Sequence, residues 1–114
     1  MNLLLATALL LISAVAVGFY LVFLGLRQRK RSPGLGLTHA GLALSGLIVL
    51  FTEIFTGPTD KLNNVAALFL FFAIVGGGMV FALHEENRPP SMTAVTVHAI
   101  MGLFGIALLI INLF

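Results

Sequence analysis

The chain has 114 residues, of which 60% are hydrophobic and 9% are charged, and it contains no Cys. Because soluble domains carry about 25% charged residues, and disordered chains are more polar still, this composition excludes both classes. The missing cysteines exclude disulfide scaffolds, thiol catalysis and thiolate metal sites. The net charge of +2 comes from a few loop residues and gives no sign of nucleic-acid binding. The composition therefore predicts a small, all-α integral membrane protein.

Four apolar stretches are each long enough to cross a bilayer as a helix, which takes about 20 residues. In chain order, the expected spans are 3–26, 37–56, 62–83 and 93–113. Charged residues, Pro or Gly separate each span from the next, and these residue types commonly end helices. Because the connections are short, consecutive helices should be antiparallel neighbours. We expect residues 1–114 to form a single four-helix transmembrane bundle.

The basic residues predict how the bundle is oriented. Five of the six Lys and Arg residues lie in the first and third loops, and only Lys61 lies in the second. Since loops rich in Lys and Arg stay on the cytoplasmic side, the first and third loops should lie inside. Both termini should then lie outside. We expect a multi-pass protein of a bacterial inner (plasma) membrane.

The sequence aligns with itself at an offset of 59 without a gap, with residues 1–55 matching residues 60–114. Fifteen of the 55 aligned pairs are identical, and leucine matches carry little weight in so apolar a chain. Three pairs involve residue types that are scarce here, namely Arg29 with Arg88, Ser32 with Ser91, and His39 with His98. The pattern predicts two parallel helical-hairpin repeats related by an axis along the membrane normal, where sites tend to form between the repeats.

The second and fourth spans carry matching stripes, with members at successive steps of four, three, four and three residues. The stripe of the second span consists of His39, Ala43, Gly46, Leu50 and Glu53. The stripe of the fourth span consists of His98, Gly102, Gly105, Leu109 and Asn112. This spacing keeps the residues on one helix face, and ionisable groups within spans usually face the bundle interior. We expect the two His to lie at equal depth and to face each other across the bundle centre.

Two facing imidazoles with small residues beside them suit a flat iron porphyrin, because haem iron accepts neutral imidazole as an axial ligand. His39 and His98 are therefore the candidate metal ligands. The residues expected to leave room for the macrocycle are Ala43, Gly46, Gly102 and Gly105. Arg29 and Arg88 lie ten residues before the histidines and could pair with the two haem propionates, since Arg matches carboxylate geometry.

This arrangement resembles small membrane-embedded b-type cytochromes, in which two His on separate helices of a four-helix bundle hold one haem. The resemblance covers the helix count, His39, His98 and the nearby glycines, and it is one of arrangement rather than of a sequence motif. It implies haem b as the cofactor and one-electron transfer as the function. The implied partners, besides the lipid bilayer, are a quinone or the subunits of a respiratory complex. An enzyme is the less favoured class, because no set of residues for hydrolytic or transfer chemistry could meet.

Two other functions stay open. The chain could be a non-catalytic accessory or assembly subunit, because small residues such as those of the stripes also let helices pack closely. It could instead be a small proton-coupled transporter that works as a homo-oligomer, with Glu53 as the proton-carrying group. Small multidrug-resistance exporters have a similar length, but the carboxylate typical of their first helix is missing from residues 3–26. His84 is a secondary candidate, either as a solvated residue or as an additional ligand.

Overall fold

The computed structural model describes residues 2–27, 33–82 and 91–114, and these residues form four helices and no strand. The helices are α1 (Leu3–Leu26), α2 (Pro33–Thr56), α3 (Lys61–Ala82) and α4 (Met92–Leu113). All four are long and apolar enough to cross a membrane. The structure thus confirms the predicted all-helical class, and the four spans fit an integral membrane protein.

The ends of the helices follow from local hydrogen bonding. Side-chain oxygens satisfy free backbone N–H groups at three helix starts, where Asn2 accepts from Leu4, Asp60 from Leu62, and Ser91 from Ala94. Helix α2 begins at Pro33, four residues before the predicted start of the second span. Proline is favourable at the first helical position because it lacks an N–H group that would be unsatisfied there. In consequence His39 and His98 each lie six residues after the first residue of their helix.

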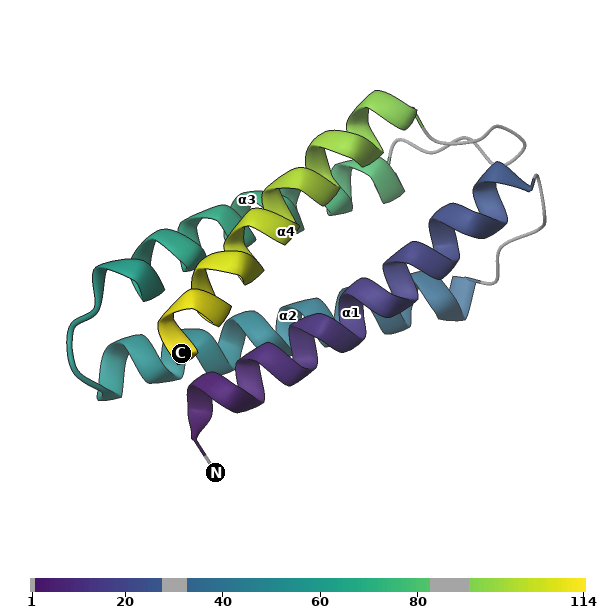
Figure 1. Cartoon of the computed structure of the whole chain (residues 1–114). Coiled ribbons are helices and arrows are strands. Elements are labelled where there is room, and N and C mark those ends of the chain that lie inside the picture. The colour runs from purple at the N-terminus through teal and green to yellow at the C-terminus, as the bar shows by residue number, and fades with distance from the viewer. Residues whose placement is uncertain (1, 28–32, 83–90) are drawn as a thin grey trace.

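The helices form an antiparallel bundle of two hairpins, α1–α2 and α3–α4, which lie side by side (Figure 1). Packing is closest within each hairpin, while α2 with α3 and α1 with α4 make the looser contacts between hairpins. The pairs α1 with α3 and α2 with α4 do not pack against each other and are therefore the diagonals of the bundle. The two histidine-bearing helices face each other across this diagonal.

The main cluster of buried hydrophobic residues fills one half of the bundle, which we name the leucine half. Its members are Leu4, Leu11, Leu47, Leu50, Ala66, Ala67, Leu70, Ile106 and Leu109. The other half, named the histidine half, contains His39 and His98. There α2 before Gly46 and α4 before Gly105 contribute no buried residue, and the buried side chains are those of Ala14 and Leu24 on α1 and Ala73 on α3. The ribbons of the two hairpins also lie closer together at the end that carries both chain termini than at the opposite end (Figure 1).

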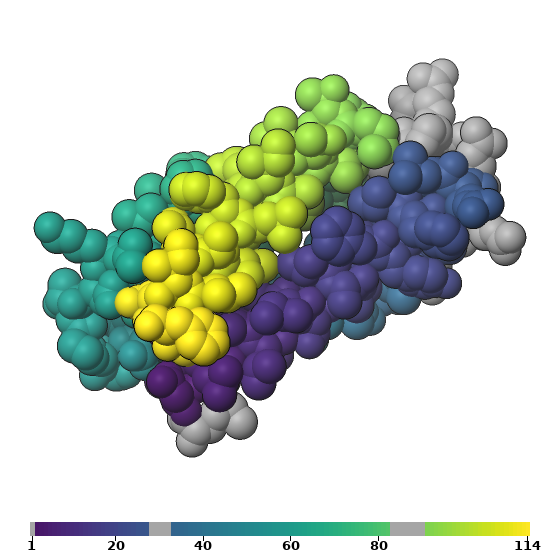
Figure 2. All heavy atoms as spheres, in the orientation of Figure 1, coloured from purple at the N-terminus to yellow at the C-terminus, as the bar shows by residue number. Residues whose placement is uncertain are grey.

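The outer surface of the bundle is apolar. Large hydrophobic side chains are exposed on every helix, among them Phe19, Phe55, Phe72 and Ile100. Figure 2 shows one such face, along which side chains of α1 and α4 meet. Helices that are apolar on all sides are typical of membrane spans, where lipid rather than water surrounds them.

Candidate functional site

The structure brings the two predicted histidines together. His39 of α2 and His98 of α4 are both half-buried. Their ring centroids lie 5.9 Å apart and the ring planes are nearly perpendicular, at 82°. Because α2 and α4 are diagonal helices, the imidazoles meet in the middle of the bundle rather than along one helix seam.

Each imidazole is hydrogen-bonded to the neighbouring helix of its own hairpin. The Nδ1 atom of His39 lies 2.7 Å from the carbonyl oxygen of Ala14 on α1, and Nδ1 of His98 lies 2.6 Å from that of Ala73 on α3. A carbonyl oxygen can only accept, so Nδ1 carries the proton and donates it in both bonds. In a neutral imidazole, Nε2 then keeps its lone pair as the free donor atom for a metal.

The spacing of the rings fits a pair of imidazoles that share one metal ion. Metal–imidazole bonds are about 2 Å long and the ring centre lies roughly 1 Å further, which separates the two ring centres by about 6 Å. The observed separation is 5.9 Å. Ligating histidines almost always donate their other N–H to a carbonyl or carboxylate, as both do here. The two neutral nitrogen donors of His39 and His98 could also hold a haem iron.

Two glycines lie against the imidazoles. A Cβ atom placed on Gly18 would lie 2.9 Å from Cε1 of His39, and one placed on Gly77 would lie 2.7 Å from Cε1 of His98. Real Cβ atoms essentially never approach other atoms this closely. The rings therefore occupy the space that a side chain at either position would need.

The space beside Gly46 and Gly105 is already filled, which differs from the expectation that both leave room for a macrocycle. A Cβ on Gly46 would lie 2.7 Å from Cδ2 of Leu11, and one on Gly105 would lie 2.8 Å from Cγ of Leu70. Both glycines are buried, and each receives a leucine from the other helix of its hairpin. Their structural role is close helix packing in the leucine half.

The remaining predicted cofactor-binding residues divide into two groups. Ala43 and Gly102, one turn after the histidines, are half-buried, and a Cβ on Gly102 would be 3.8 Å from Cβ of Ala73, an ordinary contact. These two small residues are compatible with a bulky neighbour. Arg29, Arg88 and His84 lie outside the described residues.

The polar groups at the far ends of the two stripes differ between the hairpins. The amide of Asn112 on α4 donates to Oδ1 of the buried Asn63 on α3, at 2.7 Å. Glu53 on α2 stands at the position equivalent to Asn112 and is half-buried. Its partner position on α1 is Leu4, which has no polar side-chain atom to accept or donate. Glu53 lies near the end of α2 and His39 near its start, so the carboxylate is far from the histidines, at the opposite end of the bundle.

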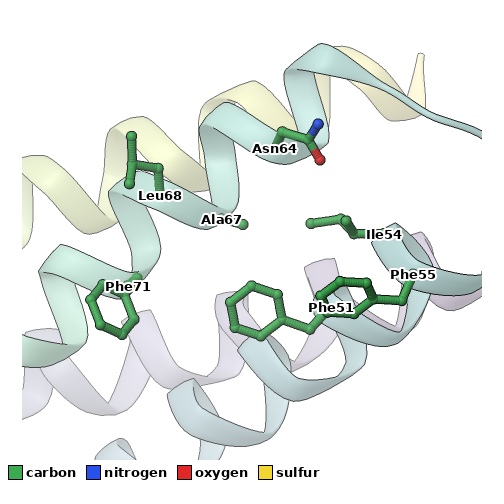
Figure 3. Close-up of a pocket in the computed structure, with 7 residues that line it drawn as sticks. All are labelled: Phe51, Ile54, Phe55, Asn64, Ala67, Leu68 and Phe71. Carbon is green, nitrogen blue, oxygen red and sulfur yellow. The ribbon is translucent and has the colours of Figure 1, made fainter.

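An open groove runs between α2 and α3 in the leucine half (Figure 3). Its lining consists of Phe51, Ile54, Phe55, Asn64, Ala67, Leu68 and Phe71. Only the Asn64 amide is polar, so the groove offers mainly hydrophobic contact. Within the described part of the chain, no group of three or more His, Cys, Asp or Glu could hold a metal ion.

Four residues at the imidazoles are missing from the sequence-based prediction of the site, namely Ala14, Gly18, Ala73 and Gly77. The self-alignment contained a signal for them, because Ala14 pairs with Ala73 and Gly18 with Gly77 at the offset of 59. Their contact with the histidines depends on which face of α1 and α3 turns toward α2 and α4, and the sequence does not specify this.

Comparisons of the chain with models of protein families, with curated proteins and with solved structures gave no match.

Proposed function

We propose that the protein is a membrane haem protein that binds one haem b between His39 and His98 and takes part in electron transfer. The observation that carries the proposal is the pair of diagonal imidazoles, 5.9 Å apart. Each holds its Nδ1 proton on a backbone carbonyl, which leaves two Nε2 atoms as donors. A haem held by two such donors would alternate between the ferrous and ferric states and carry one electron at a time.

The uneven packing of the bundle supports the same proposal. Protein interiors are normally filled to the density of organic crystals. Here the buried residues of α2 and α4 begin only at Gly46 and Gly105, so α2 and α4 contribute little to the packing of the histidine half, where Ala14, Leu24 and Ala73 are the buried side chains. A large planar group between the hairpins would supply the missing contacts. The small side chains of Ala43 and Gly102 would border it.

We also propose that the two hairpins are parallel repeats, each supplying one ligand. In support, α2 and α4 begin 59 residues apart, and the histidine bonds and the glycine contacts recur at the same offset. With the positively charged loops inside, both termini lie outside a plasma membrane and the haem lies nearer its inner side. Arg29 and Arg88, in these loops, are the proposed partners of the haem propionates.

The chain's own residues would perform three tasks at this site. His39 and His98 bind the iron, and their bonds to Ala14 and Ala73 fix the ring orientation and raise the basicity of Nε2. The surrounding apolar helices exclude water, which sets the reduction potential through burial. Electrons would be exchanged with a quinone or with a respiratory subunit in the same membrane.

The test is an absorption spectrum of the full chain, purified in mild detergent after expression with added haem, first oxidised and then reduced with dithionite. We expect a Soret band and a sharp α band that shift on reduction, as a six-coordinate haem gives. Replacing His39→Ala or His98→Ala should abolish the spectrum, and either change alone should suffice.

Matched controls are available one residue earlier on each helix. Thr38 and Val97 are exposed, and they stand at equivalent positions of the two hairpins. Thr38→Ala and Val97→Ala should leave the spectrum unchanged. A wild-type protein without visible absorption, or a spectrum that survives loss of both histidines, would overturn the haem proposal and favour an accessory subunit.

A further inference from the structure

We infer that Gly18 and Gly77 are positioning residues that select Nε2 of His39 and His98 as the metal-binding nitrogens, an inference that rests on the proposed haem site. Each glycine exposes one backbone carbonyl of its helix to an imidazole of the neighbouring helix. The hydrogen bond formed there holds the proton on Nδ1.

The reason lies in the geometry of the α-helix. The carbonyl of residue i accepts the N–H of residue i+4, and the side chain of residue i+4 points back toward the preceding turn. A side chain at position 18 would therefore cover the carbonyl of Ala14, and one at position 77 would cover that of Ala73. Both carbonyls instead accept an imidazole Nδ1–H, at 2.7 and 2.6 Å.

The contacts show how little space is left at the two positions. A Cβ on Gly18 would be 3.2 Å from Nδ1 of His39, and one on Gly77 would be 3.1 Å from Nδ1 of His98, in addition to the closer contacts with Cε1. An alanine at either position would thus push the ring away from the carbonyl. Without that bond, the proton is no longer confined to Nδ1.

The neighbouring glycines show that the effect is specific to these two positions. A Cβ on Gly76 or Gly78, which flank Gly77 on α3, would have no atom within 4 Å. The same is true of Gly41 on α2. The three-glycine run in α3 therefore contains one residue that the imidazole requires and two that it does not contact.

The first measurement is ¹⁵N NMR of the histidine side chains in the full chain, in the dithionite-reduced state where a six-coordinate haem is diamagnetic. We expect a protonated, slowly exchanging Nδ1 on both His39 and His98 in the wild type. In Gly18→Ala, exchange of the His39 Nδ1 proton with water should become about tenfold faster, which corresponds to the loss of one hydrogen bond. Gly77→Ala should act in the same way on His98 alone.

The second measurement is the midpoint potential of the bound haem. The Nδ1–H bond makes the imidazole a stronger donor and stabilises ferric iron. Both alanine variants should therefore raise the potential, while Gly76→Ala and Gly78→Ala should leave it unchanged. A general loss of helix packing would not speed the exchange of the Nδ1 proton at one histidine alone.

The outcomes separate this inference from the proposal on which it rests. Protonation on Nε2 in the wild type, or unchanged proton exchange in Gly18→Ala and Gly77→Ala, would overturn the positioning role even if haem is bound. If an alanine variant fails to fold, the ¹⁵N NMR spectrum of the wild type still tests the inference, because protonation on Nε2 there would overturn it. A wild type that binds no haem yet shows the expected Nδ1 protons would overturn the haem proposal and leave the hydrogen bonds from the imidazoles to the carbonyls of Ala14 and Ala73 established.

Discussion

The two halves of the bundle are held together by different means. In the leucine half, Leu50 and Leu109 are completely buried, and Gly46 and Gly105 let the helices of each hairpin approach closely. In the histidine half, the inward groups of α2 and α4 are two half-buried imidazoles, each bonded to a carbonyl. Lipid tails are as apolar as the side chains of the helices, so burial in the bundle gives no hydrophobic driving force. Close packing is therefore a main source of association between membrane helices. The leucine half therefore supplies the stability of the bundle.

The difference is the one expected if the proposed site occupies the histidine half. A chain selected only for a stable bundle would continue the leucine and glycine pattern along the whole length of α2 and α4. Instead the pattern begins only at Gly46 and Gly105, and the imidazoles of His39 and His98 lie two turns before these glycines. Departures from good packing are expected at functional sites, where stability is given up for chemistry. Substitutions in the leucine half should thus change stability and leave the absorption spectrum expected from the proposed haem site intact.

The largest loss of stability is expected for Gly46→Leu or Gly105→Leu. Each change places a side chain where Leu11 or Leu70 already lies, so the hairpin must separate. Overpacking of this kind costs about 3 kcal/mol or more of unfolding free energy. The measurement is helix content by circular dichroism during SDS titration of the protein in detergent. Gly41→Leu, at a position with open space, is the control and should have little effect.

A smaller loss is expected for Leu50→Ala and Leu109→Ala, which leave cavities in the centre of the core. Such truncations cost about 2 kcal/mol or more where the surroundings cannot collapse. Leu44→Ala and Leu103→Ala provide matched controls, because these leucines are 50% and 42% exposed. The same SDS titration measures all four variants. If the controls destabilise the protein as much as the core variants do, the core does not lie in the leucine half.

Much of the fold was predictable because each span is long, apolar and bounded by Pro, Gly or charge. The start of α2 was not, because Pro33 was interpreted as part of a loop, although proline is equally suited to the first helical position. The meeting of His39 and His98 was predictable from the stripes. A regular spacing fixes which residues share a face, and polar groups within spans turn inward.

The functions of the glycines were harder to predict. An inward glycine can admit either a cofactor or a neighbouring helix, and the sequence does not distinguish the two. Gly46 and Gly105 proved to admit Leu11 and Leu70. Gly18 was assigned no role at all, since its contact with His39 depends on the rotation of α1 against α2. Such rotations are set by the packing of whole helices rather than by local sequence.

A still smaller effect is expected for Asn63→Leu in the leucine half. This change removes the interhelical hydrogen bond that Asn112 donates to Asn63. Such a bond between membrane helices contributes about 1 kcal/mol to stability. The substitution also introduces the residue type found at the equivalent position of the first hairpin, Leu4, so the shape is tolerated. Thermal unfolding in detergent measures the change. Asn64→Leu, at the exposed neighbouring position, should change the melting temperature much less.

The smallest effect is expected for Glu53→Gln, which sharpens the comparison between the hairpins at their polar ends. Glu53 is half-buried beside the end of α2, whereas its counterpart Asn112 is bonded to Asn63. Removing a carboxylate charge that can reach the headgroup region should change the unfolding free energy by less than about 0.5 kcal/mol. The spectrum of the proposed haem should not change, because the helical rise separates Glu53 from His39 by about 21 Å. Proton flux into vesicles carrying the wild type but not Glu53→Gln would contradict this expectation and assign the carboxylate to transport, since only a proton-carrying group would make flux depend on that one charge.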